Sequence, residues 1–141
     1  MSFNIVSHTA DVAVELTAPD MQGMLETTTA ALRFLIAGST NLAPATEAEI
    51  MVSGDSLEHL LVRWVNELIF LYDARGQLAL SARRIQIRSG ADGHRACAQV
   101  MMCNTREAML QPDSDLKAAT FHNLAVASVD GGLKATLVID T

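Results

Sequence analysis

The sequence contains few cysteines and no long apolar run. Cys97 and Cys103 are six residues apart and form no CxxC pair, so we expect small buried thiols in a reducing compartment. The most apolar segment, residues 64–72, is interrupted by Asn66 and Glu67. It falls well short of the ~20 apolar residues that a membrane-spanning helix requires. These features argue against a disulfide scaffold and a membrane-spanning protein.

Basic residues are also scarce. Lys and Arg number 10 against 16 Asp and Glu, which gives a formal net charge of −6 with neutral histidines. This balance argues against an autonomous nucleic-acid-binding protein, because neutralisation of phosphates supplies most of that affinity. The first basic side chain is Arg33, so the opening lacks the basic region of a secretory signal. We therefore expect a cytoplasmic protein.

Half of the residues are hydrophobic and 18% are charged, a composition typical of one folded domain, here expected over residues 1–141. Apolar periodicity predicts two helices, one ending at Gly38 and one ending at Gly76. Alternation predicts strands over residues 3–6, 12–16, 47–53, 82–88, 94–102, 117–128 and 133–140. The predicted fold is an α+β single domain with two helices packed on an antiparallel-rich β-sheet.

Local signals predict where the helices begin. Pro19 fits the first turn of the first helix. Asp55-Ser56-Leu57-Glu58 resembles a capping box, with a polar N-cap and a glutamate three residues on. In the second helix Phe70 is among the apolar residues that widen the buried face, so we expect cover on more than one side of this helix.

The last two residues are the first candidate site. Asp140 follows an alternating strand, and the α-carboxylate of Thr141 would lie beside its side chain. Two carboxylates ~4 Å apart repel by about 4 kcal/mol at an effective dielectric of ~20. A hard cation such as Ca²⁺, Mg²⁺ or Mn²⁺ would convert that repulsion into coordination. The alternative is a solvated strand end.

Two further segments carry polar residues of interest. In His8-Thr9-Ala10-Asp11, Asp11 either caps a turn or acts as a metal ligand or general base, with His8 as its neighbour. In residues 116–122, Lys117 and His122 are either strand residues without a functional role or part of a site.

Two further groups of polar residues can be explained either as solvent-exposed surface or as sites of contact. Asn66 and Glu67 interrupt an apolar helix and either lie on its exposed strip with His59 and Arg63 or find partners. The cluster Arg83, Arg84, Arg88 and Arg95 is either a solvated hairpin face or a docking surface for an acidic partner or RNA.

Together, four segments resemble the archease family over the whole chain. They are His8-Thr9-Ala10-Asp11 with the strand after it, residues 60–68, Lys117-Ala118-Ala119-Thr120-Phe121-His122, and the ending Val138-Ile139-Asp140-Thr141. Their order and spacing agree with the family. One departure is residues 103–115, which lack the histidine that archeases often carry before the lysine motif, so a ligase contact there would differ.

The resemblance implies an accessory protein of an RtcB-type RNA ligase, which joins RNA ends in tRNA splicing and RNA repair. Archeases are thought to promote guanylylation of that ligase and to permit multiple turnover. The family places a divalent metal ion at residues matching Asp11, Asp140 and Thr141, and Lys117 and His122 match its lysine motif. We assign no catalytic residue and expect an activator, with RNA contacted only indirectly.

Two other functions stay open. One is a specificity or chaperone-like factor for an RNA-modifying methyltransferase. The other is a stand-alone metal-dependent phosphohydrolase, against which the sequence offers one plausible metal site and no clear nucleophile.

Overall fold

The computed structural model describes residues 1–7, 11–112, 116–121 and 124–141. The elements, in chain order, are β1 (Ser2–Ser7), β2 (Asp11–Ala18), α1 (Met21–Ala37), β3 (Thr46–Gly54), α2 (Leu57–Arg75), β4 (Gln77–Gly90), β5 (Gly93–Asn104), β6 (Ala118–Thr120), β7 (Ala127–Val129) and β8 (Gly132–Asp140). The predicted α+β class with two helices and antiparallel strands is confirmed.

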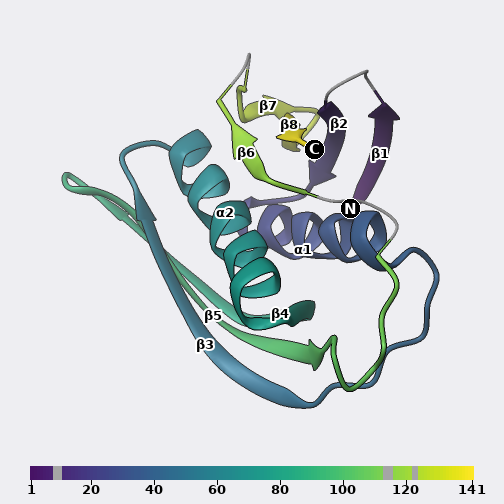
Figure 1. Cartoon of the computed structure of the whole chain (residues 1–141). Coiled ribbons are helices and arrows are strands. Elements are labelled where there is room, and N and C mark those ends of the chain that lie inside the picture. Colours follow the sequence, from purple (N-terminus) through teal and green to yellow (C-terminus); the bar gives the residue numbers. More distant parts are fainter. Residues whose placement is uncertain (8–10, 113–115, 122–123) are drawn as a thin grey trace.

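The strands form two separate antiparallel sheets, and the two helices lie between them (Figure 1). One sheet has the order β1-β2-β8-β6, with β7 also paired to β8; the other has the order β3-β5-β4. Trp64 of α2 is fully buried, and its indole N–H donates to the Thr29 hydroxyl of α1 at 3.1 Å. The helices therefore share one core with the inner faces of both sheets, which agrees with the cover on several sides predicted for α2.

The inner face of the five-stranded sheet follows the predicted alternation. Leu137 and Ile139 of β8 are buried and pair with Val14 and Val12 of β2. On each of these two strands, the side chains that alternate with the buried ones lie on the opposite face of the sheet. Asp11 and Asp140 belong to that outer face.

The N-caps of the two helices differ from the predicted ones, whereas the C-caps Gly38 and Gly76 are confirmed. The N-cap of α1 is Asp20, whose side chain accepts from the Gly23 N–H at 2.7 Å, so Pro19 precedes the helix instead of lying in its first turn. The N-cap of α2 is Ser56, whose hydroxyl accepts from the His59 N–H. The predicted role of Glu58 as the returning residue is wrong, because it lies only two residues after the true N-cap.

His59 occupies the returning position instead, and its ring nitrogen accepts from the Asp55 N–H at 3.2 Å. Farther along α2, Phe70 is 49% exposed, so it does not belong to the buried face as predicted. The guanidinium of Arg75 lies over the Phe70 ring, 5.8 Å from its centroid, and shields part of it.

The predicted long strand over residues 117–128 is two short strands, β6 and β7. Both pair with the same edge of β8: Ala118 with Asp140, and Ala127 with Lys134. The second pairing is nine residues later in the chain but only six positions along β8, so three residues are extra. Those extra residues prevent a continuous ladder, and sequence alternation alone did not reveal this interruption.

Candidate metal site at the β2–β8 end

Asp11 and Asp140 lie directly opposite each other where β2 begins and β8 ends. Opposed residues of an antiparallel pair have Cβ atoms about 4.5–5.5 Å apart and project from the same face. The β2–β8 pairing therefore brings together two carboxylates that are far apart in the sequence. The placement is the one that a metal site at these residues requires.

Asp11 has an unusual environment for a carboxylate. Its Oδ1 atom is buried and has no hydrogen-bond partner in the part of the chain that the structure describes. A buried polar atom left unpaired costs about 1–3 kcal/mol, and more when it is charged. A neighbouring like charge on Asp140 adds to this cost. A bound cation is a physical remedy for both, so the side chains present fit a metal ion.

The other side of β8 fixes the last residues of the chain. The Lys117 N–H donates to the Asp140 carbonyl at 2.9 Å, and Ala118 pairs with Asp140. If this register is continued by one residue, Lys117 stands opposite Thr141. Both Lys117 and Thr141 are exposed, so the lysine side chain and the last residue are accessible at this end of the sheet.

Asn66 supports β6 from α2. Its side-chain oxygen accepts from the Ala119 N–H at 2.7 Å, and its amide donates to the Ala119 carbonyl at 3.5 Å. These contacts pair both main-chain groups of Ala119, which is 6% exposed. Asn66 therefore has a structural partner, and the alternative of an exposed polar strip is wrong for this residue.

The remaining predicted residues are not brought to the acidic pair by any contact of the described residues. Glu67 is half-buried and lines a hollow of about 350 Å³ with Arg63 and Met51, between α2 and β3. His8 and His122 lie outside the described residues, so their roles stay predictions.

The donor set favours a hard cation. Carboxylate oxygens are ligands that Ca²⁺, Mg²⁺ and Mn²⁺ prefer. Among the described residues, no group of three or more His, Cys, Asp and Glu side chains is arranged around a common metal position. A site here would combine Asp11 and Asp140 with another oxygen, such as the terminal carboxylate of Thr141.

One contact that was not predicted from the sequence joins Glu58 of α2 to Val126, just before β7. The Glu58 carboxylate accepts from the Val126 N–H at 3.3 Å, and the ring of the neighbouring His59 packs against Phe121 with centroids 5.7 Å apart. These contacts hold Phe121 and Val126 against the start of α2. Such a long-range contact leaves no local pattern in the sequence.

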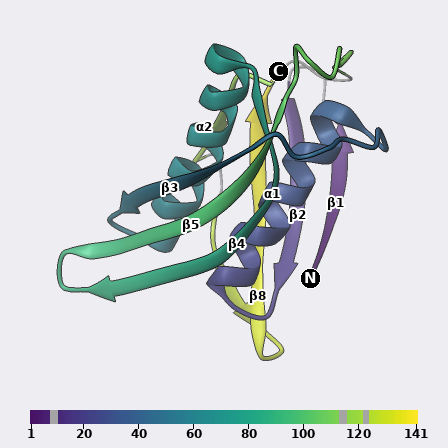
Figure 2. The same cartoon turned by 90° about the horizontal axis from the view of Figure 1, so that it is seen from below.

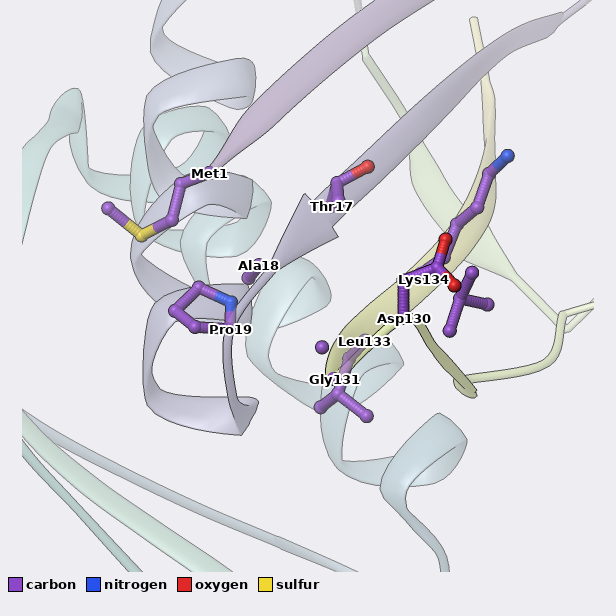
Figure 3. Close-up of a pocket in the computed structure, with 10 residues that line it drawn as sticks. Met1, Thr17, Ala18, Pro19, Asp130, Gly131, Leu133 and Lys134 are labelled. Atoms are coloured by element: carbon purple, nitrogen blue, oxygen red, sulfur yellow. The ribbon is translucent and has the colours of Figure 1, made fainter.

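A hollow of about 500 Å³ lies at the opposite end of the same sheet (Figure 3). Met1 and Pro19 bound it on one side, and Asp130, Gly131 and Lys134 bound it on the other. Its Ala18 is seven positions along β2 from Asp11, about 24 Å of strand. This hollow is therefore distinct from the candidate metal site.

The fold and this site together define a class of small α+β protein whose helices lie between two antiparallel sheets and whose opposed carboxylates mark one sheet end. The profile of the Archease protein family matches residues 3–141. The chain belongs to the archease family.

Individual relatives agree with this assignment. The chain is 26% identical to the protein archease of Archaeoglobus fulgidus, and the match covers 99% of both chains. It is 28% identical to the protein archease of Methanopyrus kandleri, again over 99% of both.

A solved structure has the same fold. The solution structure of Methanobacterium thermoautotrophicum protein 1598 superposes with a TM-score of 0.81 at 23% identity. The match covers 99% of this chain and 98% of that protein. At this level of identity the likeness concerns the fold.

Neither helix in the described part of the chain has the length and apolar character needed to cross a membrane.

Proposed function

We propose that this protein is an accessory factor that activates an RtcB-type RNA ligase in the cytoplasm, acting in tRNA splicing or RNA repair. Membership of the archease family supports the proposal. The observation that carries it is the opposed pair Asp11 and Asp140, with the buried and unpaired Oδ1 of Asp11. A solvated strand end would leave both oxygens of each carboxylate to water.

In this proposal Asp11, Asp140 and the terminal carboxylate of Thr141 hold one divalent cation, Ca²⁺, Mg²⁺ or Mn²⁺. When bound, such an ion supplies charge stabilisation and orientation for phosphoryl groups. The chain positions the groups that would hold the ion. The β2–β8 register sets the spacing of the two aspartates, and the Lys117 N–H holds the main chain of Asp140.

The exposed Lys117 side chain is the group we assign to contact with the ligase or its nucleotide. Asn66 acts indirectly by holding β6, which carries the lysine segment, against α2. The protein acts by favouring a ligase conformation that is competent for guanylylation, which requires that it bind this conformation more tightly than the others. No chemical step is assigned to the protein itself.

A guanylylation assay with the ligase of the same organism tests the proposal. Asp11→Ala, Asp140→Ala and a one-residue extension after Thr141 should each abolish stimulation. Glu15→Ala is the matched control, because Glu15 lies on the same face of β2 and pairs with Thr136 instead of an acidic residue. Full stimulation by all three site variants would refute the metal-site mechanism.

Experiments with the same purified protein can distinguish the other two functions from ligase activation. Capture of an RNA-modifying methyltransferase in place of the ligase would favour the specificity-factor role. Turnover of a phosphodiester by the purified protein alone would favour a phosphohydrolase.

A further inference from the structure

The outer face of the three-stranded sheet carries a second like-charge pair. Arg88 of β4 and Arg95 of β5 lie directly opposite each other, and both are exposed. Like charges in this position are destabilising. Arg83, farther from the hairpin turn, forms an ion pair with Glu47 at 3.4 Å, whereas neither Arg88 nor Arg95 has an ion-pair partner among the described residues.

A hollow of about 210 Å³ lies against these two arginines. Its other lining residues are Met51, Gln86 and Cys97. Met51 is 56% exposed, so an apolar surface lies next to the two guanidinium groups. Gln86 adds an amide that can both donate and accept hydrogen bonds.

The position of this hollow favours access by a large ligand. The β4–β5 hairpin extends beyond the helices in both views (Figures 1 and 2). Although the chain is acidic, the hairpin holds four of its ten basic residues within residues 83–95. One acidic residue, Asp92 at the turn, lines the adjoining hollow with the same two arginines.

We propose that Arg88, Arg95, Gln86 and Met51 form a binding surface for single-stranded RNA, which we call the hairpin surface. The two guanidinium groups bind backbone phosphates, for which their planar donor geometry is suited. Gln86 and Met51 contact an unstacked base through its polar edge and its face. Carboxylate side chains would pair with the arginines alone, whereas each nucleotide carries a base beside its phosphate that can pack on the exposed Met51, so the lining favours RNA.

The hairpin surface is separate from the acidic pair, since the two belong to different sheets. Its RNA binding therefore needs no metal ion. Only its role, that of holding substrate RNA for the ligase, rests on the proposed function. Although the net charge of −6 disfavours RNA binding by the chain as a whole, the local positive charge of the hairpin supplies the contact.

Fluorescence anisotropy with a labelled oligouridylate of about 12 nucleotides, within the range that single-strand-binding domains cover, tests the proposal. The double variant Arg88→Gln/Arg95→Gln should lose at least tenfold in affinity at low salt. Two lost phosphate contacts should also reduce the slope of log K against log salt by about 1.4. Arg75→Gln/Lys134→Gln removes the same charge from exposed sites elsewhere and should change affinity little.

Each result decides the matter. Equal losses in the two double variants, unchanged binding by Arg88→Gln/Arg95→Gln, or no binding by the unmodified protein would overturn the proposal. Polyglutamate of the same length and charge, bound as tightly as RNA, would overturn it in favour of an acidic protein partner. Asp11→Asn should bind RNA normally even where it fails to stimulate the ligase, which separates this proposal from the proposed function.

Cys97 provides an independent reporter inside the hollow. Both cysteines were expected to be buried, but Cys97 is only half-buried, whereas Cys103 is 2% exposed and burial raises the pKa of its thiol. Alkylation by N-ethylmaleimide, followed by mass spectrometry, should therefore occur first at Cys97. Oligouridylate should slow that reaction at least fivefold and polyglutamate should not; equal rates with and without RNA would contradict the proposed surface.

Discussion

Each of the two sheets carries a pair of like charges directly opposed across neighbouring strands. In the five-stranded sheet the pair is Asp11 and Asp140, and in the three-stranded sheet it is Arg88 and Arg95. The pairs differ in solvation: Asp11 Oδ1 is buried without a partner among the described residues, whereas both arginines are exposed. Water and salt can therefore screen the arginine pair much better than the aspartate pair.

The difference predicts two kinds of ligand. A partly buried anionic pair favours a small cation that can occupy the space between carboxylates. An exposed cationic pair on a protruding hairpin favours a large anion whose binding weakens as salt rises. Unfolding and metal-binding measurements on variants of each pair can test this difference between the two sheets.

Metal binding should give the largest effect on stability. At a free metal concentration 100 times the Kd, a ligand that binds only the folded state stabilises it by about 2.7 kcal/mol. Calorimetric unfolding of chelator-treated protein, with and without Ca²⁺, Mg²⁺ or Mn²⁺, measures this gain. Asp11→Asn and Asp140→Asn should lose it, and Glu15→Gln should retain it. An equal gain in Asp11→Asn would show that the ion binds elsewhere.

Asn66→Ala should have the next largest effect on stability. It should destabilise the protein by about 1–3 kcal/mol, because the main-chain groups of the buried Ala119 lose their partners. Urea unfolding without metal measures the change. The exposed Arg63→Ala on the same helix is the control and should stay within about 0.5 kcal/mol of the parent. If β6 positions the acidic pair, Asn66→Ala should also weaken metal binding; unchanged metal affinity would separate β6 from the site.

Without metal, Asp140→Asn should stabilise the protein, by up to about 1 kcal/mol, because it removes a like charge opposite Asp11. The sign should reverse when the metal is saturating. Urea unfolding in chelator and in excess metal gives both values. Destabilisation of the metal-free protein would mean that the two carboxylates do not repel each other.

Arg88→Gln should give the smallest effect, a stabilisation of a few tenths of a kcal/mol at low salt, since both arginines are exposed. The gain should vanish near 1 M salt. Arg83→Gln is the control. Because Arg83 has an acidic partner in Glu47, removing the Arg83 charge should not stabilise the protein. Thermal unfolding at two salt concentrations measures both. A larger gain for Arg88→Gln than for Asp140→Asn would reverse the comparison.

Much of the fold was predictable because its signals are local. The two helices and the glycines that end them, Gly38 and Gly76, follow from apolar periodicity and from the residues that favour helix ends. The exact N-caps were not predictable, because Asp55 and Ser56 are both good caps and tertiary contacts of the flanking chain decide between them.

From the residues alone, the candidate site was predictable only in its residue types. Asp11, Asp140 and Lys117 were candidates on their chemistry, and the resemblance to archeases then grouped Asp11 and Asp140 with Thr141. The sequence did not reveal that Asn66 pairs with Ala119 or that Glu58 binds the Val126 N–H, since these contacts depend on how α2 packs against β6 and against Val126.

Local sequence is enough to specify which segments are helices, which are strands, and which face of each strand is apolar, because 3.6-residue and two-residue periodicities are properties of neighbouring residues. The position of Asp11 opposite Asp140 and the division of residues 117–128 into β6 and β7 depend instead on tertiary packing. The alternation of apolar residues indicates which face of a strand is buried, but it does not indicate which strand pairs with it. The partner and the register come from packing all the buried faces against one helix layer.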